Sequence, residues 1–274
     1  MMFFKLPKDL IIKIALSLDL PNLSTFFELN KKCKEITSDN DIFWLNKIIT
    51  EYELEDSTVL VKSIDQSWKD YYKFIISLTP NDLLMTGSEK GRLDLIKLGL
   101  KTGGNMFLTY SPDDYDYIHP LLKACMNGHL KIVEELIKLG INHEYEEEYH
   151  ISLVMAGYNG YLNIVKYLLN NGLNISTHGE NILREVCYSE DTDKDKIVEV
   201  VKYLVEEQGV IIDDISFNIA CEYGHLKIVK YMINHGYIIN INNNQGMDEA
   251  YLSKHYEIVD FLQDYFAYYS IEYR

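Results

Sequence analysis

The sequence predicts an all-α protein in which a solenoid of helical repeats follows a small three-helix domain. The main observation is a segment at residues 128–142 that recurs at 160–174 and 224–236, each copy with two glycines twelve positions apart. Between the glycines, apolar residues fall at the spacing of one helical face and polar residues fall on the other. A helix this short is marginal alone in water, so its apolar face must pack against a neighbouring copy.

Weaker copies extend the series at 91–105, 200–209 and 254–262. Each helix is expected to end at its second glycine, because a residue without a Cβ adopts a left-handed backbone at little cost. In the first weak copy Gly99 replaces a core leucine, so we expect that unit to be weakened. The second has one extra residue before its closing glycine, and the third has Lys254 in place of the leading glycine.

The copies recur about every 33 residues, a length typical of ankyrin repeats and one short of the tetratricopeptide length. The segments before the leading glycines, such as 119–125 and 215–221, resemble the Thr-Pro-Leu-His-x-Ala opening of ankyrin repeats. Residues 128–142 resemble the second helix and hairpin of that family. The resemblance implies six ankyrin-like repeats over 81–274, at approximately 81–105, 117–142, 149–174, 180–211, 213–240 and 245–274.

The composition is that of a globular chain of 274 residues with 47% apolar content. No apolar run approaches the 18 or more residues of a membrane helix, and the first residues lack the cleavage site of a signal peptide. We therefore expect a monomeric, cytoplasmic protein without a membrane partner. Cys125, Cys187 and Cys221 fall at one repeat position in successive layers, too far apart for disulfides, which indicates buried reduced thiols.

The charge is strongly acidic and unevenly spread. The chain has a formal net charge of −16, whereas residues 1–50 hold seven lysines against six acidic residues, so the repeats carry the excess. An acidic array repels phosphate backbones, which disfavours nucleic acid as a partner. It favours a basic protein partner, although an acidic surface is also an ordinary means of staying in solution.

The N-terminal residues 3–50 contain no repeat and predict three short helices. The stretch 6–23, with Leu-Pro at its start and Leu-Pro-Asn-Leu at its end, and the later 42–44, with Ile-Phe-Trp, resemble an F-box. That family docks on the Skp-type adaptor of cullin-RING ubiquitin ligases. The resemblance implies docking through Leu6, Pro7, Ile14, Leu20, Pro21 and Leu23. Alternatively, these helices only form a structural cap for the repeats.

Residues 51–80 carry an apolar stripe at helical spacing without glycine or an internal proline, which predicts a helical bridge between the N-terminal domain and the repeats. The aromatic tail at 265–269 is expected to pack as the opposite end of the array. Both segments are therefore interpreted as architecture.

Catalytic and metal-binding motifs fail on inspection, so we expect no enzyme, no cofactor and no metal site. Residues 191–195 mimic a calcium loop, but Lys196 stands where that loop needs glycine and Lys202 where it needs glutamate. His129 and His225 recur beside the leading glycine, where a hydrogen bond within the turn is expected.

Function is then expected at surfaces. Repeat arrays bind proteins through aligned loop tips and first helices, and tyrosine is enriched at interface anchors. The predicted target-binding residues at the loop tips are Tyr115, Tyr117, Glu144, Tyr145, Tyr149 and His178.

Two functional hypotheses follow from these features. In the first, the repeats bind a target protein and the F-box-like segment recruits it to a Skp/cullin ubiquitin ligase. In the second, the chain is an ankyrin scaffold or decoy with no ligase role. An F-box-like module before ankyrin repeats, in a chain rich in Ile, Lys, Asn and Tyr, is similar to proteins of giant DNA viruses, which implies a host ligase.

Overall fold

The computed structural model divides the chain into two compact units, residues 1–108 (unit 1) and 109–274 (unit 2). All regular structure is helical over the residues that the structure describes. These are 7–29, 34–35, 37, 40–54, 60, 62, 65–107, 119–141, 146–172, 175, 179–190, 194–238 and 245–272. Each unit is described below by itself.

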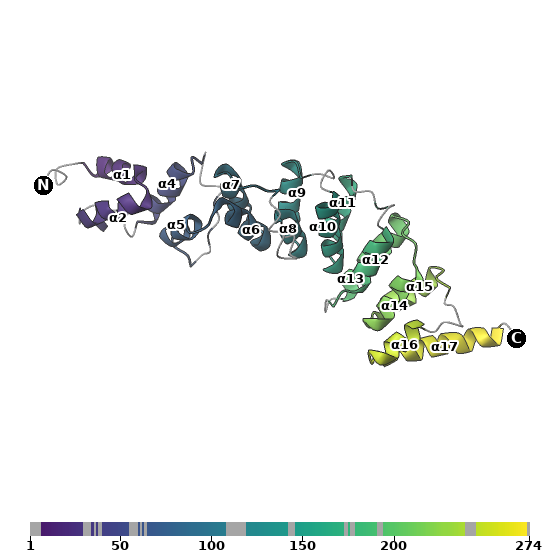
Figure 1. The fold of residues 1–274 in the computed structure, drawn as a ribbon. Helices are drawn as coiled ribbons and strands as arrows, with labels where there is room; N and C mark the ends of the chain where they lie inside the picture. Colours follow the sequence, from purple (N-terminus) through teal and green to yellow (C-terminus); the bar gives the residue numbers. More distant parts are fainter. Residues whose placement is uncertain are drawn as a thin grey trace, which may run out of the picture. The chain divides into compact units, whose positions relative to one another are not determined.

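Unit 1 begins with the expected N-terminal helices and ends with the first repeat (Figure 1). Its described helices are α1 (Lys8–Ser17), α2 (Leu20–Leu29), α4 (Asp41–Glu51), α5 (Trp68–Ile76), α6 (Pro80–Lys90) and α7 (Leu93–Lys101). Helix α4 starts in the expected acidic stretch, because the Asn40 side chain accepts a hydrogen bond from the Phe43 amide at 3.2 Å. Helix α6 starts with a capping box in which Thr79 and Asp82 satisfy each other's backbone amides.

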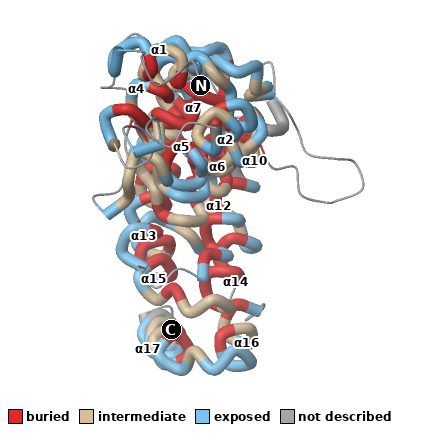
Figure 2. Tube along the Cα trace, turned by 90° about the vertical axis from the view of Figure 1, so that its left-hand side faces the viewer, coloured by how far each residue is buried: buried red, intermediate tan, exposed pale blue. Residues whose placement is uncertain are grey.

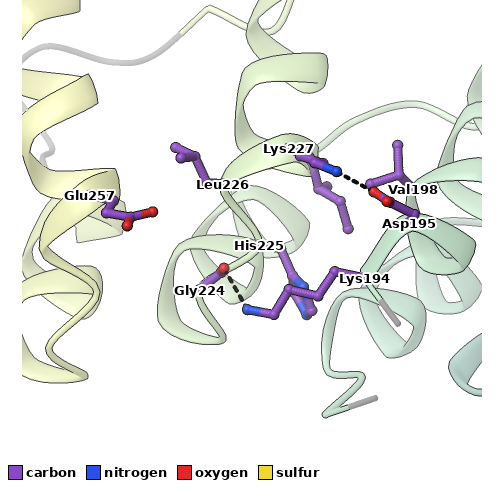
Figure 3. Close-up of a pocket in the computed structure, with 9 residues that line it drawn as sticks. Lys194, Asp195, Val198, Gly224, His225, Leu226, Lys227 and Glu257 are labelled. Atoms are coloured by element: carbon purple, nitrogen blue, oxygen red, sulfur yellow. Dashed lines mark hydrogen bonds and ion pairs between the residues drawn. The ribbon is translucent and has the colours of Figure 1, made fainter. Parts of the chain in front are cut away.

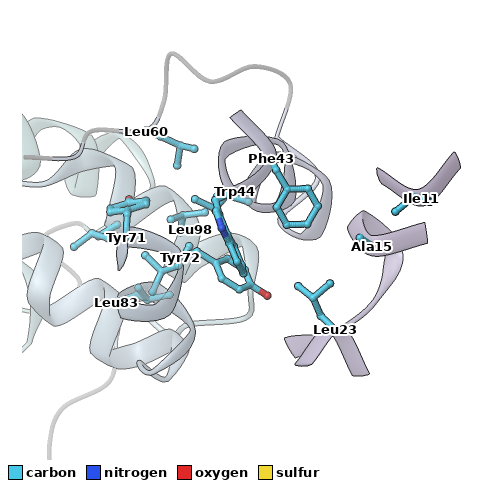
Figure 4. Packing of buried hydrophobic residues seen from close by; sticks show 13 residues of the cluster. Ile11, Ala15, Leu23, Phe43, Trp44, Leu60, Tyr71, Tyr72, Leu83 and Leu98 are labelled. Carbon is cyan, nitrogen blue, oxygen red and sulfur yellow. The ribbon is translucent and has the colours of Figure 1, made fainter. Parts of the chain in front are cut away.

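One continuous apolar core runs through unit 1. It joins α1, α2 and α4 to the bridge helix α5 and to the first repeat, as Figure 4 shows for Leu23, Trp44 and Tyr72. The rings of Trp44 and Tyr72 lie 5.3 Å apart between centroids, and both residues are buried. The N-terminal helices therefore share their core with the bridge and the first repeat.

A buried lysine fixes the end of α1. Lys47 on α4 is 2% exposed, and its ammonium donates to the carbonyls of Leu16 (2.9 Å) and Leu18. The same group lies 3.0 Å from the Glu51 carboxylate. Because the last carbonyls of a helix lack partners within the helix, this ammonium serves as their donor and stabilises the turn between α1 and α2.

The bridge is less helical than its apolar stripe predicts. Helix α5 covers only Trp68–Ile76, and the described residues between α4 and α5 are not helical. The Ser67 side chain accepts from the Asp70 amide at 3.1 Å and so starts the helix at Trp68.

Hydrogen bonds to Asp94 hold α5 to the first repeat, and a glycine brings the two helices of that repeat together. The Tyr71 hydroxyl donates to Asp94 at 2.6 Å, and the Arg92 Nε donates to the same carboxylate at 3.0 Å. Gly99 on α7 lies so close to α6 that a Cβ there would stand 2.8 Å from the Pro80 carbonyl oxygen. The two helix backbones therefore approach each other at this point, where only a glycine fits.

Unit 2 consists of helix pairs that stack in chain order (Figure 1). The first helices are α8 (Pro120–Met126), α10 (Glu146–Tyr158), α12 (Gly179–Cys187), α14 (Asp214–Glu222) and α16 (Gln245–Leu252). The second helices are α9 (Leu130–Lys138), α11 (Leu162–Asn170), α13 (Lys194–Lys202), α15 (Leu226–Asn234) and α17 (Tyr256–Glu272). Figure 2 shows α12, α14 and α16 in one column and α13 and α15 in another, with buried residues between them.

The apolar faces read from the repeated segment form this core. In α9 the residues Ile132, Val133 and Leu136 are all at most 1% exposed. The expected helix stops also hold, since Gly140 and Gly172 have φ values of 109° and 108°. The three repeat cysteines are buried free thiols, as expected, and burial raises the pKa of the Cys125 thiol.

The leading glycines meet two demands at once. Gly128 and Gly224 have φ values of 74° and 73°, which a side chain rarely adopts. A Cβ on Gly128 would lie 2.6 Å from the Tyr161 ring, and one on Gly224 would lie 2.5 Å from the His255 ring. In the last repeat Lys254 replaces the glycine and still has a φ of 65°.

The degenerate copy over 180–211 absorbs its extra residue locally. Helix α13 is followed by a π-helical turn, η4 (Tyr203–Glu207), and the chain then leaves the helix before Gly209, whose φ is 70°. A π turn accommodates one inserted residue without ending the helix. At the end of the chain, Tyr265 and Phe266 on α17 are half-buried, whereas Tyr268 is exposed.

Candidate protein-binding surface

Three successive first helices end in a tyrosine. Tyr158 is the last residue of α10, Tyr188 directly follows α12, and Tyr223 directly follows α14. Each stands just before the turn into the second helix of its repeat. We call Tyr158, Tyr188 and Tyr223 the tyrosine patch.

The tyrosine patch is accessible and its rings interact. Tyr188 is 36% exposed, and Tyr158 and Tyr223 are half-buried. The rings of Tyr188 and Tyr223 meet edge to face, with centroids 5.2 Å apart and an interplanar angle of 88°. Since each repeat contributes one ring, stacking of the repeats itself brings these aromatic side chains to one surface.

Two glutamates stand next to the patch in the chain, Glu190 two residues after Tyr188 and Glu222 directly before Tyr223. Partial burial raises the pKa of the Tyr223 phenol, and the charges of Glu222 and Glu190, together with Tyr188 and Tyr158, raise it further. Among the residues that the structure describes, neither glutamate forms an ion pair with a lysine or arginine. The surface therefore combines aromatic rings with two carboxylates that have no ion-pair partner among these residues.

A pocket of about 390 Å³ lies between α13, α15 and α17 (Figure 3). The Lys194 ammonium donates to the Gly224 carbonyl at 2.9 Å, and Lys227 pairs with Asp195. Glu257 faces the same space from α17. Both lysines of this pocket thus bind groups of the protein itself, and their bonds join α13 to the repeat of α15.

His225 lies at the wall of this pocket, and its hydrogen bond reaches the preceding repeat instead of staying within its own turn as expected. It is 2% exposed, and its Nε2 lies 2.9 Å from the Ser189 carbonyl oxygen, which can only accept, so Nε2 carries the proton. Burial, and next the charge of Lys194, lower the pKa of His225 to about 4. The imidazole is therefore neutral near pH 7 and joins two consecutive repeats.

The predicted loop-tip residues fall mostly outside the described part of the chain: Tyr115, Tyr117, Glu144, Tyr145 and His178. Tyr149 is described and does not lie at a loop tip. It lies in the first turns of α10, 1% exposed, with its hydroxyl 3.4 Å from the Leu168 carbonyl oxygen on α11. The prediction for Tyr149 is wrong because α10 begins at Glu146, so that the ring turns into the core.

The predicted docking residues of unit 1 are divided between surface and core. Pro7 and Pro21 are exposed and Ile14 is half-buried, whereas Leu23 is 0% exposed and belongs to the core. Leu23 is therefore corrected from a docking residue to a core residue. Leu6 and the side chain of Leu20 lie outside the described residues.

Sequence reasoning missed two kinds of surface residue. Leu10 and Ile42 in unit 1 are 43% and 70% exposed. The second kind is the tyrosine patch, whose members lie outside the apolar positions that define the repeat. Its signal is the recurrence of an aromatic residue one or two positions before a leading glycine, as in Tyr158 and Tyr223.

Over the described residues, no cluster of three or more His, Cys, Asp or Glu side chains could hold a metal ion. None of the described helices has both the length and the apolar character needed to cross a membrane.

The stacked pairs of short antiparallel helices define unit 2 as a helical repeat array of the kind that binds other proteins. The family model described as "Ankyrin repeats (3 copies)" matches residues 84–179 and again residues 187–272, which is more than half of the chain. The protein thus belongs to the ankyrin-repeat family. A comparison with curated proteins found no match.

Proposed function

We propose that the protein is an adaptor in which the ankyrin repeats bind a target protein and the F-box-like segment recruits it to a Skp/cullin ubiquitin ligase in the cytoplasm. The observation that carries the first half is the tyrosine patch, where consecutive repeats present aromatic rings beside unpaired carboxylates. Aromatic side chains anchor protein interfaces because they offer a large contact area at a low entropic cost.

The second half is supported by the arrangement of α1, α2 and α4. Three short helices share a core, while Pro7 and Pro21 of the F-box-like motif stay on the surface. Leu10 and Ile42 add exposed apolar area on α1 and α4, and apolar groups left in water favour a partner that covers them.

Co-purification tests the ligase half directly. The full chain would be incubated with a purified Skp-type adaptor, beside a Pro7→Ala/Pro21→Ala variant and a control variant, Lys13→Ala/Glu28→Ala, changed at exposed positions of the same helices. We expect binding by the native chain and the control, and loss with the proline variant. Binding that survives the proline change would refute the assigned docking residues.

A second candidate, a scaffold without a ligase role, is favoured by one observation. The core that joins α1, α2 and α4 to α5 and the first repeat has the character of a structural cap. If the folded native chain does not bind the adaptor, this second function stands. Deleting residues 1–50 would then destabilise the first repeat without affecting any ligase association.

A further inference from the structure

The chemistry of the tyrosine patch is suited to one class of side chain. The rings of Tyr188 and Tyr223 lie 5.2 Å apart between centroids, and their faces carry partial negative charge and attract cations. Glu190, two residues after Tyr188, and Glu222, directly before Tyr223, add full negative charges and are not buried. A neutral apolar group would gain nothing from these carboxylates and would remove them from water at a cost. A lysine or arginine side chain matches both features.

The backbone at the patch has the same polarity. Tyr188 and Tyr223 follow the C-terminal ends of α12 and α14, where the unpaired carbonyls of a helix carry partial negative charge. The chain already uses this polarity, since the Lys194 ammonium donates to the carbonyl of Gly224 at 2.9 Å, one residue after Tyr223.

Elsewhere in unit 2, a tyrosine ring and a glutamate together bind a lysine side chain. The Lys166 ammonium lies 4.6 Å from the centroid of the Tyr203 ring and 3.4 Å from the Glu207 carboxylate. A tyrosine ring and a glutamate on η4 thus bind a lysine of the preceding repeat. The tyrosine patch presents more rings and two carboxylates, and the described residues supply no such lysine to its glutamates.

We propose that the tyrosine patch binds a lysine or arginine side chain of the target, so that the partner of the repeats is a basic protein segment. This inference rests on the proposed target-binding function and names its partner class. Successive cationic residues of the partner contact Tyr158, Tyr188 and Tyr223 in order along consecutive repeats, with Glu190 and Glu222 pairing their charges.

The probe is a fluorescein-labelled ten-residue peptide in which arginine and glycine alternate, compared with a peptide in which glutamine replaces arginine. Fluorescence anisotropy with the full chain would measure both affinities at low and at physiological salt. We expect the arginine peptide to bind at least about 10-fold more tightly than the glutamine peptide. A chain that does not discriminate between the two peptides overturns the proposal.

Variants then place the binding at the patch. Tyr188→Ala/Tyr223→Ala and, separately, Glu190→Gln/Glu222→Gln should each weaken the arginine peptide by about 5-fold or more, and the glutamine substitutions should also reduce the salt dependence. The glutamine variant preserves side-chain volume, so it tests the proposal even if the alanine variant misfolds. Far-UV circular dichroism would check that each variant is folded.

The matched control is Glu134→Gln/Glu135→Gln, which makes the same change of net charge on α9. We expect this control to change the affinity by less than about 2-fold, because the Debye length at physiological salt is about 8 Å. Equal weakening by the control and the patch variant would show that the acidic chain attracts the peptide non-specifically, and it would overturn the proposal. The test with the Skp-type adaptor uses unit 1, so its result is read independently of this one.

Discussion

Replacing Asp94 by alanine should destabilise unit 1 by about 3–5 kcal/mol, the range for breaking a buried ion pair. The Asp94 side chain is 0% exposed and accepts hydrogen bonds from the Tyr71 hydroxyl at 2.6 Å and from Arg92. Loss of the bond from charged Arg92 costs about 1.5–3 kcal/mol, and the buried Tyr71 hydroxyl left without an acceptor costs about 1–3 kcal/mol. The raised pKa of Tyr71, caused by burial and by the bond to Asp94, reflects the same buried environment.

The chain provides a selective assay for this change. Its two tryptophans, Trp44 and Trp68, both lie in unit 1, so intrinsic tryptophan fluorescence reports on the unfolding of that unit. With a denaturant dependence of about 3 kcal/mol per molar guanidinium chloride, a loss of about 3–5 kcal/mol should lower the midpoint by about 1–1.7 M. A Tyr71→Phe substitution in the Asp94→Ala background should recover about 1–2 kcal/mol, since it removes the orphaned hydroxyl. An unchanged midpoint for Asp94→Ala, or no recovery in the double variant, would refute the reasoning.

The remaining predictions concern unit 2 and are read by far-UV circular dichroism during denaturation. Gly128→Ala should lower the free energy of unfolding by about 1–2 kcal/mol more than Gly140→Ala. Both glycines have a positive φ, but only a Cβ at position 128 would lie 2.6 Å from a neighbouring ring. Equal losses for the two variants would contradict the close approach at Gly128. Lys254→Gly should stabilise the last repeat by about 0.5–1 kcal/mol by relieving its left-handed backbone, whereas Ser253→Gly should not. His225 has a pKa of about 4 in the folded chain and 6.5 in the unfolded chain, so between these pH values the unfolded chain binds a proton that the folded chain does not. The free energy of unfolding should therefore be highest above pH 6.5 and should fall, by at most about 3 kcal/mol, as the pH drops toward 4. A His225→Gln variant should lose less stability over that range than the native chain, and an equal loss would exclude this histidine as the cause.

The repeats could be predicted from the sequence because their core positions recur with one period. Comparing copies identifies the buried positions of α9 and the glycines that end the second helices, and the structure has both. Gly99 shows the limit of this comparison. Comparing the copies shows only that Gly99 lacks the side chain of a core leucine. In the structure, α6 and α7 lie closer together at this position, so no side chain is needed there.

The candidate site was harder to predict than the fold. Tyr149 lies in an acidic stretch that reads as a loop, but α10 is 13 residues long and extends back to include it. Helix boundaries depend on tertiary packing as well as on local propensity, so they are the least predictable property of a repeat. The tyrosine patch depends on which exposed positions of neighbouring repeats meet in space, and a pattern based on apolar spacing does not contain that information.

The π-helical turn η4 keeps the array in phase across an insertion. The extra residue is taken up between Tyr203 and Glu207, and the same turn still contacts both neighbours, since Lys166 lies over the Tyr203 ring and Tyr231 donates to Glu206. The length change is thus confined to one turn, whose side chains still reach the second helices of the repeats before and after it. An ankyrin array can in this way change the length of one unit while keeping that unit in contact with both of its neighbours.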